Sequence, residues 1–317
     1  MTTTTTFVPE TRDLDGDDAQ ATMRRVGVAQ LLSRSLQRFR AADGSSHARS
    51  LGWVISLVML QGIIATVGLA TALGQGDIAN VIARTVKDVV PGSAGETLQT
   101  TLDQAAESGT SHRYTALLIG TFSAIVTSTT GFGQVERAAN RIYGVESDRP
   151  SVQKYARALG LALTAGVATA LAFVMIAVGR NVGQAIENDA LSTAWDIARW
   201  PLGVLLLVVA VTAIVTWSPR RTQPQPSWMV FGGAISVLAW ILVSVGMSLF
   251  LRWSGTFGET YGPLAGVVAL LTWSFLSAIA LLAGLAVAAE LEAERTLFAS
   301  GARSRGQDGA IAHQNGR

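Results

Sequence analysis

Six long apolar stretches without any Asp, Glu, Lys, Arg or His dominate the pattern of this chain. They cover residues 51–73, 114–132, 158–179, 200–217, 228–251 and 260–289. Each is long enough, or nearly so, to cross a hydrocarbon layer of about 30 Å as a helix that rises about 1.5 Å per residue. A soluble domain does not need six such runs, so the pattern predicts an integral membrane protein.

The spans are expected to be helices rather than barrel strands. A backbone that crosses lipid must satisfy its own hydrogen bonds, which leaves helices or a closed barrel. Barrel strands would alternate in polarity over about ten residues, whereas these runs are longer and continuously apolar. Only 15% of the residues are charged, and the charges lie in the loops and the ends. The expected fold is an all-α bundle of six transmembrane helices.

Lysine and arginine are distributed unevenly between the loops. The N-terminal segment, the second and fourth loops and the C-terminal segment hold 18 of the 24 basic residues. Cytoplasmic loops carry an excess of Lys and Arg, so both termini are predicted to be cytoplasmic. An even number of spans requires the same arrangement. Both polar ends are therefore expected on the cytoplasmic face of the membrane.

The remaining segments divide the chain into a six-span domain over residues 26–298 and two polar ends. Residues 1–25 and 299–317 have little to bury and are expected to be disordered. Residues 26–42 mix apolar side chains with arginines, which favours an amphipathic helix at the cytoplasmic interface or one packed on the bundle. The outer loop over residues 74–113 is expected to form two short helices that seal the bundle or cover a cavity.

Hydroxyl side chains crowd the second span, where Ser123, Thr127, Ser128 and Thr130 lie within two turns. Such groups can bond the preceding turn or a neighbouring helix, or they can line a polar cavity. Farther along, Gly284 and Ala288 are spaced to allow close helix packing, although this spacing is common by chance.

Catalytic and cofactor-binding signals are scarce. Cysteine is absent, which excludes thiolate metal sites and cysteine nucleophiles. Glu290, Glu292 and Glu294 follow the last apolar run and are interpreted as a solvated helix end, with contact to the basic second loop as a further question. We therefore predict no enzyme, no cofactor, no metal and no nucleic-acid partner.

The last third of the chain resembles the YihY/BrkB family of bacterial inner-membrane proteins. The resemblance lies on Tyr261, Gly262, Gly266, Trp273, Ser277 and Glu290, on Trp240 and Ser244 in the preceding span, and on Asn140 and Arg141 in the second loop. It implies a multi-pass protein of the bacterial cytoplasmic (inner) membrane, with six spans and both ends cytoplasmic. The family has carried the name ribonuclease BN, but neither an acid–base pair nor metal ligands support that activity here.

The chain departs from the family pattern in two places. Met59 stands where the family usually has proline. The family's final span usually ends Gly-Ala-Glu-Leu-Asn-Ala-Glu. Without gaps, its first Glu and its Asn fall on Ala286 and Ala288, whereas a shift of four residues places that Glu at Glu290. Both alignments stay open at this point.

Two functions are compatible with these features. The first is transport or handling of a lipid-like or small amphipathic solute, with the hydroxyls of the second span lining a cavity. The alternative is a structural or partner-binding protein of the cell envelope whose polar ends serve as docking surfaces. The expected partners are membrane lipids, with anionic head groups near the N-terminal arginines. A second copy of the chain or an envelope protein is a further candidate.

Overall fold

The computed structural model describes residues 7–72, 113–184, 188–253 and 264–314, and the regular elements in these ranges are all helices. The expected helices of the outer loop, together with Tyr261 and Gly262, lie outside these ranges. The helices are α1 (Gly16–Val26), α2 (Val28–Ala41), α3 (Gly44–Ala72), α6 (Arg113–Tyr143), α7 (Ser151–Leu161), α8 (Val167–Gln184), α9 (Asp189–Trp217), α10 (Pro226–Trp253) and α12 (Ala265–Gln314). A π-helical turn, Ala162–Gly166, joins α7 to α8.

The predicted apolar runs coincide with the long helices. The first two lie on α3 and α6, and the third follows α7 through the π-helical turn into α8. The last three lie on α9, α10 and α12. Among the described residues, four segments are long and apolar enough to cross a membrane: Ser151–Ile176, Asp189–Trp217, Pro226–Trp253 and Ala265–Leu297. The prediction of a multi-pass α-helical membrane protein is therefore confirmed.

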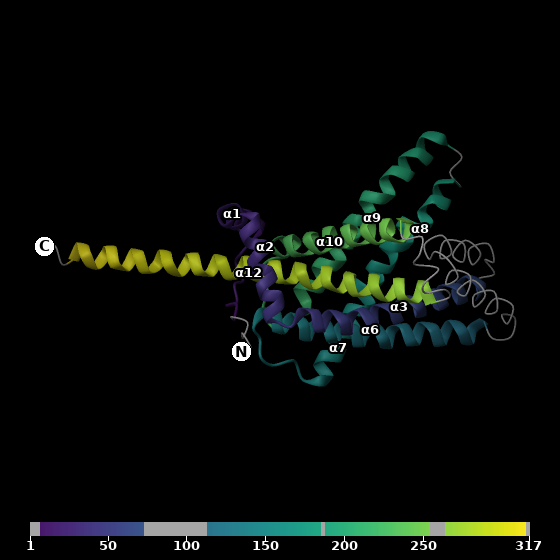
Figure 1. Cartoon of the computed structure of the whole chain (residues 1–317), viewed down its shortest axis with the longest axis horizontal. Coiled ribbons are helices and arrows are strands. Elements are labelled where there is room, and N and C mark those ends of the chain that lie inside the picture. The colour runs from purple at the N-terminus through teal and green to yellow at the C-terminus, as the bar shows by residue number, and fades with distance from the viewer. Residues whose placement is uncertain (1–6, 73–112, 185–187, 254–263, 315–317) are drawn as a thin grey trace.

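The long helices pack in an order that differs from their order in the sequence. α3 packs against both α6 and α12, α12 packs against α10, and α10 packs against α9, which in turn contacts α8. Figure 1 shows α3, α6, α10 and α12 running beside one another, with α1 and α2 gathered at one end. The last helix therefore lies between the first long helix and the α10–α9 pair.

Glycines set the closest contacts between these helices. A Cβ added at Gly52 of α3 would lie 2.7 Å from Cα of Phe275 on α12, so only hydrogen fits there. A Cβ added at Gly232 of α10 would lie 2.8 Å from Cβ of Ala288 and 3.0 Å from the carbonyl oxygen of Gly284. The Gly284 and Ala288 spacing noted in the sequence therefore marks the contact between α10 and α12.

The N-terminal segment differs from the disordered tail expected over residues 1–25. The Asp15 carboxylate caps α1 by accepting from the backbone nitrogens of Asp17 and Asp18. Val8 is buried, and its backbone nitrogen donates to the carbonyl oxygen of Tyr143 at 3.1 Å. From residue 7 onward, this segment is part of the folded structure. At the other terminus, α12 extends to Gln314, across most of the tail expected over residues 299–317.

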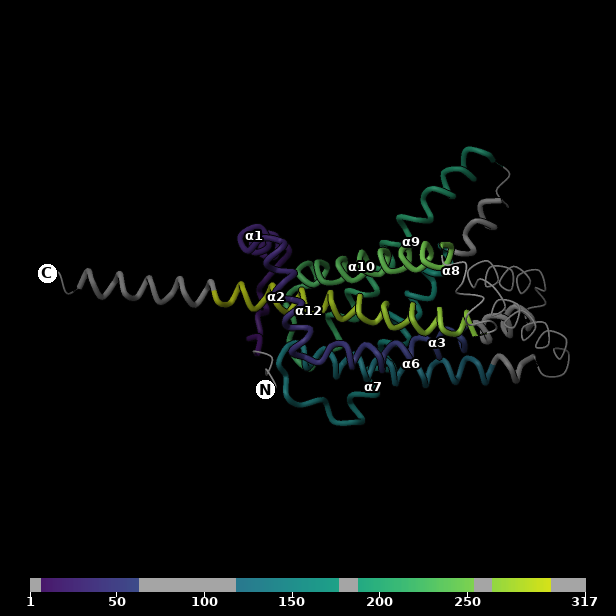
Figure 2. The backbone as a smooth tube through the Cα atoms, in the orientation of Figure 1, coloured from purple at the N-terminus to yellow at the C-terminus, as the bar shows by residue number. Residues whose placement is uncertain are grey.

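The predicted amphipathic helix is present as α2, which begins two residues later than expected. Gly27 separates it from α1 with φ 84°, a left-handed conformation that glycine adopts without strain. Leu31, Ser35, Arg38 and Phe39 form its buried face, and the helix packs mainly on α12. Figure 2 shows α2 lying across the end of the bundle. This end carries most of the polar interactions described next.

Candidate functional site

The acidic end of α12 is buried. Glu290, Glu292 and Glu294 are 8%, 0% and 6% exposed, which contradicts the interpretation of a solvated helix end. Residues four apart share one face of a helix, whereas a residue two positions away points to the opposite side. Glu290 and Glu294 therefore face one neighbour and Glu292 faces another.

The neighbour on the first face is α2. The Nε of Arg38 donates to Oε2 of Glu290 at 2.6 Å, and Arg34 forms an ion pair with Glu294. The two arginines are one turn apart on α2, as the two glutamates are on α12, so the pairs form a two-step ladder. Arg38 also donates from Nη1 to the carbonyl oxygen of Ile142 at 3.2 Å, which ties the ladder to α6.

The neighbour on the opposite face is Arg221, in the connection between α9 and α10. Its Nη2 lies 2.7 Å from Oε1 of Glu292, and its Nη1 lies 3.0 Å from Oε2, so the contact is bidentate. Thr11 donates from Oγ1 to the same carboxylate at 2.5 Å. The guanidinium also stacks 4.4 Å above the ring of Tyr143. Both charged side chains are almost completely excluded from solvent, at 1% and 0% exposure.

Arg221 helps to set the environment of the Tyr143 phenol. Tyr143 is fully buried, and this burial, together with the negative charge of Glu292, raises the pKa of its phenol. The positive charge of Arg221 acts in the opposite direction but does not outweigh burial. The phenol therefore stays protonated, and the ring serves as an apolar and cation-stacking surface.

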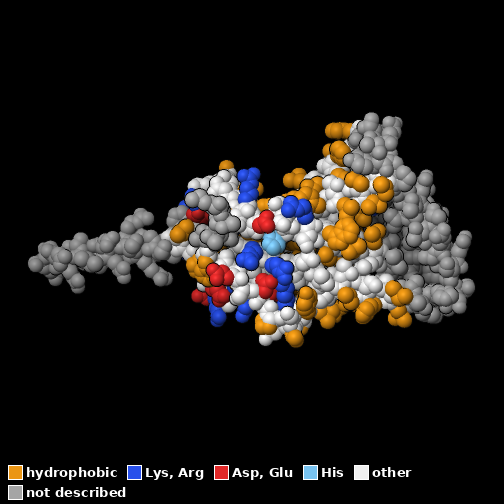
Figure 3. All heavy atoms as spheres, turned by 60° about the horizontal axis from the view of Figure 1, so that its bottom comes forward, with side chains coloured by type: hydrophobic (Ala, Val, Ile, Leu, Met, Phe, Trp, Pro, Cys, Tyr) orange, Lys and Arg blue, Asp and Glu red, His pale blue; other side chains and the backbone are white. Residues whose placement is uncertain are grey.

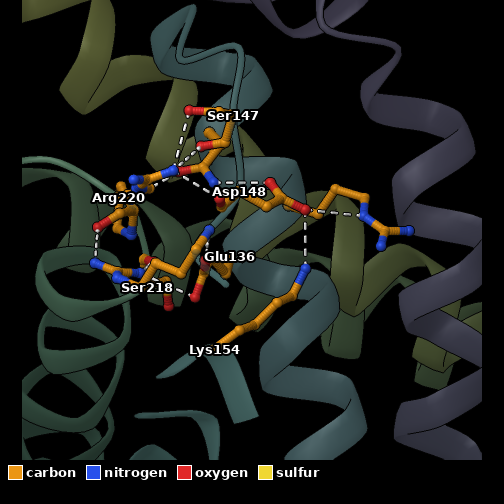
Figure 4. A network of polar contacts seen from close by, with 10 residues as sticks. Glu136, Ser147, Asp148, Lys154, Ser218 and Arg220 are labelled. Atoms are coloured by element: carbon orange, nitrogen blue, oxygen red, sulfur yellow. Dashed lines mark hydrogen bonds and ion pairs between the residues drawn. The ribbon is translucent and has the colours of Figure 1, made fainter. Parts of the chain in front are cut away.

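A second network joins α6, the connection that follows it, and the α9–α10 connection (Figure 4). Arg149 lies 2.9 Å from Glu136 and donates to the carbonyl oxygens of Ser218 at 2.9 Å and Pro219 at 2.7 Å. The Asn140 amide donates to Asp148 at 2.9 Å and accepts from the backbone nitrogen of Arg220 at 2.7 Å. The Arg149 guanidinium and the Asn140 amide thus each join segments far apart in sequence.

Asp148 is the most heavily contacted carboxylate of this second network. Lys154 lies 2.9 Å from its Oδ2 and Arg137 lies 3.3 Å from the same atom. Partial burial by itself raises the pKa of Asp148, but the hydrogen bonds from Asn140 and Lys154 and the charge of Lys154 outweigh it and lower the pKa to about 2. The group is therefore an anion throughout the neutral range and does not act as an acid or base there.

Consecutive arginines connect the two networks. Arg220 donates from Nη1 to the carbonyl oxygen of Asp148 at 2.7 Å and to Oγ of Ser147 at 3.1 Å, whereas Arg221 binds Glu292. The α9–α10 connection therefore binds the segment that follows α6 on one side and Glu292 of α12 on the other. Figure 3 shows charged side chains gathered in a band at this end, with hydrophobic side chains over the helices beyond it. We refer to the residues of both networks as the ion-paired end.

Sequence reasoning found these residues only in part. Asn140 and Glu290 stood out as family positions, and Arg220 and Arg221 entered only through the count of positive charges. The three glutamates pair with arginines of α2 and of the α9–α10 connection, whereas the question raised from the sequence was contact with the basic second loop. The matching four-residue spacing of Arg34 with Arg38 and of Glu290 with Glu294 was the one available signal.

Three other family positions come together in the membrane part of the bundle. Trp273 of α12 donates from Nε1 to Oγ of Ser244 on α10 at 3.1 Å, and its ring meets that of Trp240 edge to face at 6.2 Å. Phe173 of α8 packs against Trp240 at 5.4 Å. Ser277, also on α12, is half-buried as a residue, but its hydroxyl oxygen is fully buried. Gly266, on the same helix, is buried. Arg141 is exposed on α6.

The hydroxyls of the second span lie on α6. Ser123, Thr127 and Ser128 are half-buried, and Thr130 is exposed. Thr130 donates to the carbonyl oxygen of Val126, one turn earlier, at 3.1 Å, as the packing interpretation predicts for such a residue. The lining of a cavity by these four residues stays a prediction.

Comparison with known proteins assigns the chain to a family. The family model described as Virulence factor BrkB matches residues 35–308. The putative ribonuclease-like protein YfkH of Bacillus subtilis is 22% identical over 261 residues, which cover 80% of this chain and 92% of that protein. A UPF0761 membrane protein of Alcanivorax borkumensis is 26% identical over 216 residues, 66% of this chain but only 48% of that protein. No solved structure matches. The chain belongs to the Virulence factor BrkB family.

Proposed function

We propose that this protein is a six-span bundle of the cytoplasmic membrane that handles a lipid-like or small amphipathic solute. In this proposal both termini lie in the cytoplasm, so the ion-paired end is the cytoplasmic end. The excess of lysine and arginine in the segments that meet there supports this orientation. Buried ion pairs and hydrogen bonds join α2, α6, α12 and the α9–α10 connection at that end.

The observation that carries the proposal is a pair of hydroxyls on α12. The Oγ atoms of Ser274 and Ser277 are buried within an apolar span and have no hydrogen-bond partner among the residues that the structure describes. A buried hydroxyl without a partner costs about 1–3 kcal/mol. Because the two residues are three apart, they lie on the same side of the helix. A polar group of a bound solute would supply the missing partner.

The neighbouring side chains suit an amphipathic solute. Trp273 precedes Ser274, and its ring lies against Trp240 with its Nε1 bound to Ser244. Aromatic rings can contact an acyl chain while the hydroxyls bind the polar part. The large apolar side chains of Leu238 and Leu242 are 61% and 73% exposed on α10, which gives a lipid-facing surface beside this region.

A lipid redistribution assay tests the proposal. The protein is reconstituted in phosphatidylethanolamine and phosphatidylglycerol vesicles that contain a fluorescent phosphatidylglycerol, and the fraction reached by external dithionite is followed with time. The wild type should accelerate exchange between the leaflets, and the double variant Ser274→Val with Ser277→Val should lose most of this effect. Thr272→Val is the matched control, because Thr272 is exposed on the same helix.

Two results would contradict the proposal. The first is that vesicles with the wild-type protein exchange lipid no faster than protein-free vesicles. The second is that the double variant exchanges lipid as fast as the wild type, while Thr272→Val shows that a Val substitution on this helix leaves the exchange rate unchanged. Folding of each variant is checked by its elution volume in detergent.

The alternative of a partner-binding envelope protein has less support at the N-terminus. Its motivation was a polar tail free to dock, but residues 8–26 pack on the bundle, and Arg295 of α12 binds Asp18 of α1 at 3.2 Å. We do not propose ribonuclease activity, although one relative carries that word in its name. Four buried glutamates each form an ion pair with an arginine: Glu136, Glu290, Glu292 and Glu294. None of these four carboxylates is therefore free to act as a general base.

A further inference from the structure

We propose that α2 lies in the plane of the membrane surface at the ion-paired end and binds anionic lipid head groups along one edge. The proposal rests on the chain being a membrane protein and does not depend on transport. Its first element is a row of apolar residues that the bundle leaves uncovered. Val28, Leu32 and Leu36 are 59%, 50% and 47% exposed and follow one another at intervals of one turn.

This row is distinct from the face that α2 buries. Leu31, Ser35, Arg38 and Phe39 face the bundle, and the ladder to Glu290 and Glu294 fixes the rotation of the helix. At about 100° per residue, the row of Val28, Leu32 and Leu36 borders that buried face on one flank. Gln37, which is exposed, lies on the opposite side of the helix from Val28. The helix therefore has a bundle face, an apolar edge and a polar face.

The position of α2 along the bundle matches the membrane boundary. Gly232 of α10 is in close contact with Ala288 of α12. Glu290, the partner of Arg38, lies two residues after Ala288, a rise of about 3 Å along the axis of α12. Trp217, at the end of α9, is 49% exposed, and indole rings favour the head-group boundary. Glu292, two residues beyond Glu290 on α12, contacts the α9–α10 connection. α2 therefore lies at the level where the charge-free apolar run of α12 ends, next to Glu290.

The positive charge around α2 indicates that the bound lipid has an anionic head group. Residues 24–49 contain six arginines and a single acidic residue, Asp43. Arg34 and Arg38 are paired with glutamates of α12, whereas Arg40 is exposed one turn after Leu36 and continues the apolar row. An apolar edge that ends in an exposed arginine fits acyl chains beside a phosphate group. We therefore assign this edge to an anionic phospholipid such as phosphatidylglycerol.

Site-directed spin labelling of the full chain tests the assignment, because the protein has no native cysteine. Single variants Leu32→Cys, Leu36→Cys and Gln37→Cys are labelled and placed in nanodiscs, with Leu242→Cys as a lipid-facing reference. We expect the labels at Leu32 and Leu36 to be reached by oxygen rather than by a water-soluble nickel complex, as at Leu242. The label at Gln37 should show the reverse preference.

Lipid selectivity is tested with the same labels. Nanodiscs of phosphatidylcholine alone are compared with nanodiscs that also contain phosphatidylglycerol. The label at Leu36 should move deeper when phosphatidylglycerol is present, and Arg40→Gln should abolish that shift. Equal water access at Leu36 and Gln37 would overturn the membrane-surface placement. A lipid-exposed Leu36 whose depth ignores phosphatidylglycerol would overturn the assignment to anionic lipid and leave the solute-handling proposal unaffected.

Discussion

Arg221 and Glu292 form a bidentate ion pair that is closed off from solvent, with their side chains 1% and 0% exposed. The pair joins the α9–α10 connection to the last long helix. A buried pair contributes less net stability than its Coulomb energy suggests, because both charges lose their hydration. Removing one partner is different, since the remaining charge is then buried without compensation.

Replacing either partner should therefore destabilise the bundle strongly. We expect Arg221→Ala or Glu292→Ala to lower the free energy of unfolding by about 3–5 kcal/mol. Unfolding in a mild detergent, followed by circular dichroism, measures the change. Arg12→Ala is the control, because Arg12 is exposed and follows Thr11, which contacts Glu292. Variants at Arg221 and Glu292 that unfold like the Arg12 variant would show that the pair is not buried in the way described.

The glycine at the α3–α12 contact should not tolerate a methyl group. In Gly52→Ala the new Cβ would meet the backbone of Phe275, which cannot rotate away, so a loss of about 1–3 kcal/mol is expected. Gly246→Ala is the matched control in α10, because nothing lies within 4 Å of its added Cβ. Alanine favours a helix over glycine, so this control should be neutral or stabilising by up to about 1 kcal/mol. Equal effects at the two positions would contradict the close packing of α3 and α12.

Asp148 should make stability depend on pH only under acidic conditions. Its pKa falls from an ordinary 3.8 to about 2 in the folded protein, so its contribution is complete above the ordinary value and is lost as pH falls through about 2. The difference in unfolding midpoint between the wild type and Asp148→Asn should be constant above that range and shrink below it. A difference that changed instead near neutral pH would show that another group controls the network.

The proposed orientation can be tested by labelling. Glu146 and Ala190 are both exposed, Glu146 in the connection after α6 and Ala190 at the start of α9. With a single cysteine at position 190, an impermeant maleimide should label intact cells. With a single cysteine at position 146, labelling should require permeabilised cells. The reverse pattern would place the ion-paired end outside the cell.

The long helices were predictable because lipid imposes a simple rule on sequence. Apolar runs without charges had to become helices, and each of the six runs lies on a long helical segment wherever the structure describes it. The polar ends were harder to predict. Glu290 looked solvated because its partner, Arg38, is 252 residues away and no local pattern links the two. The segment that includes Val8 looked disordered because its composition is polar, whereas a few specific contacts hold it against α6.

The most direct test of the ion-paired end is a double-mutant cycle on Arg38 and Glu290. Free energies of unfolding are measured for the wild type, Arg38→Leu, Glu290→Leu and the double variant. We predict that each single change is strongly destabilising and that the double variant recovers part of the loss, with a coupling energy of about 1–3 kcal/mol. Strictly additive effects, with a coupling near zero, would contradict the account, because they would show that α2 and α12 are not joined by this pair.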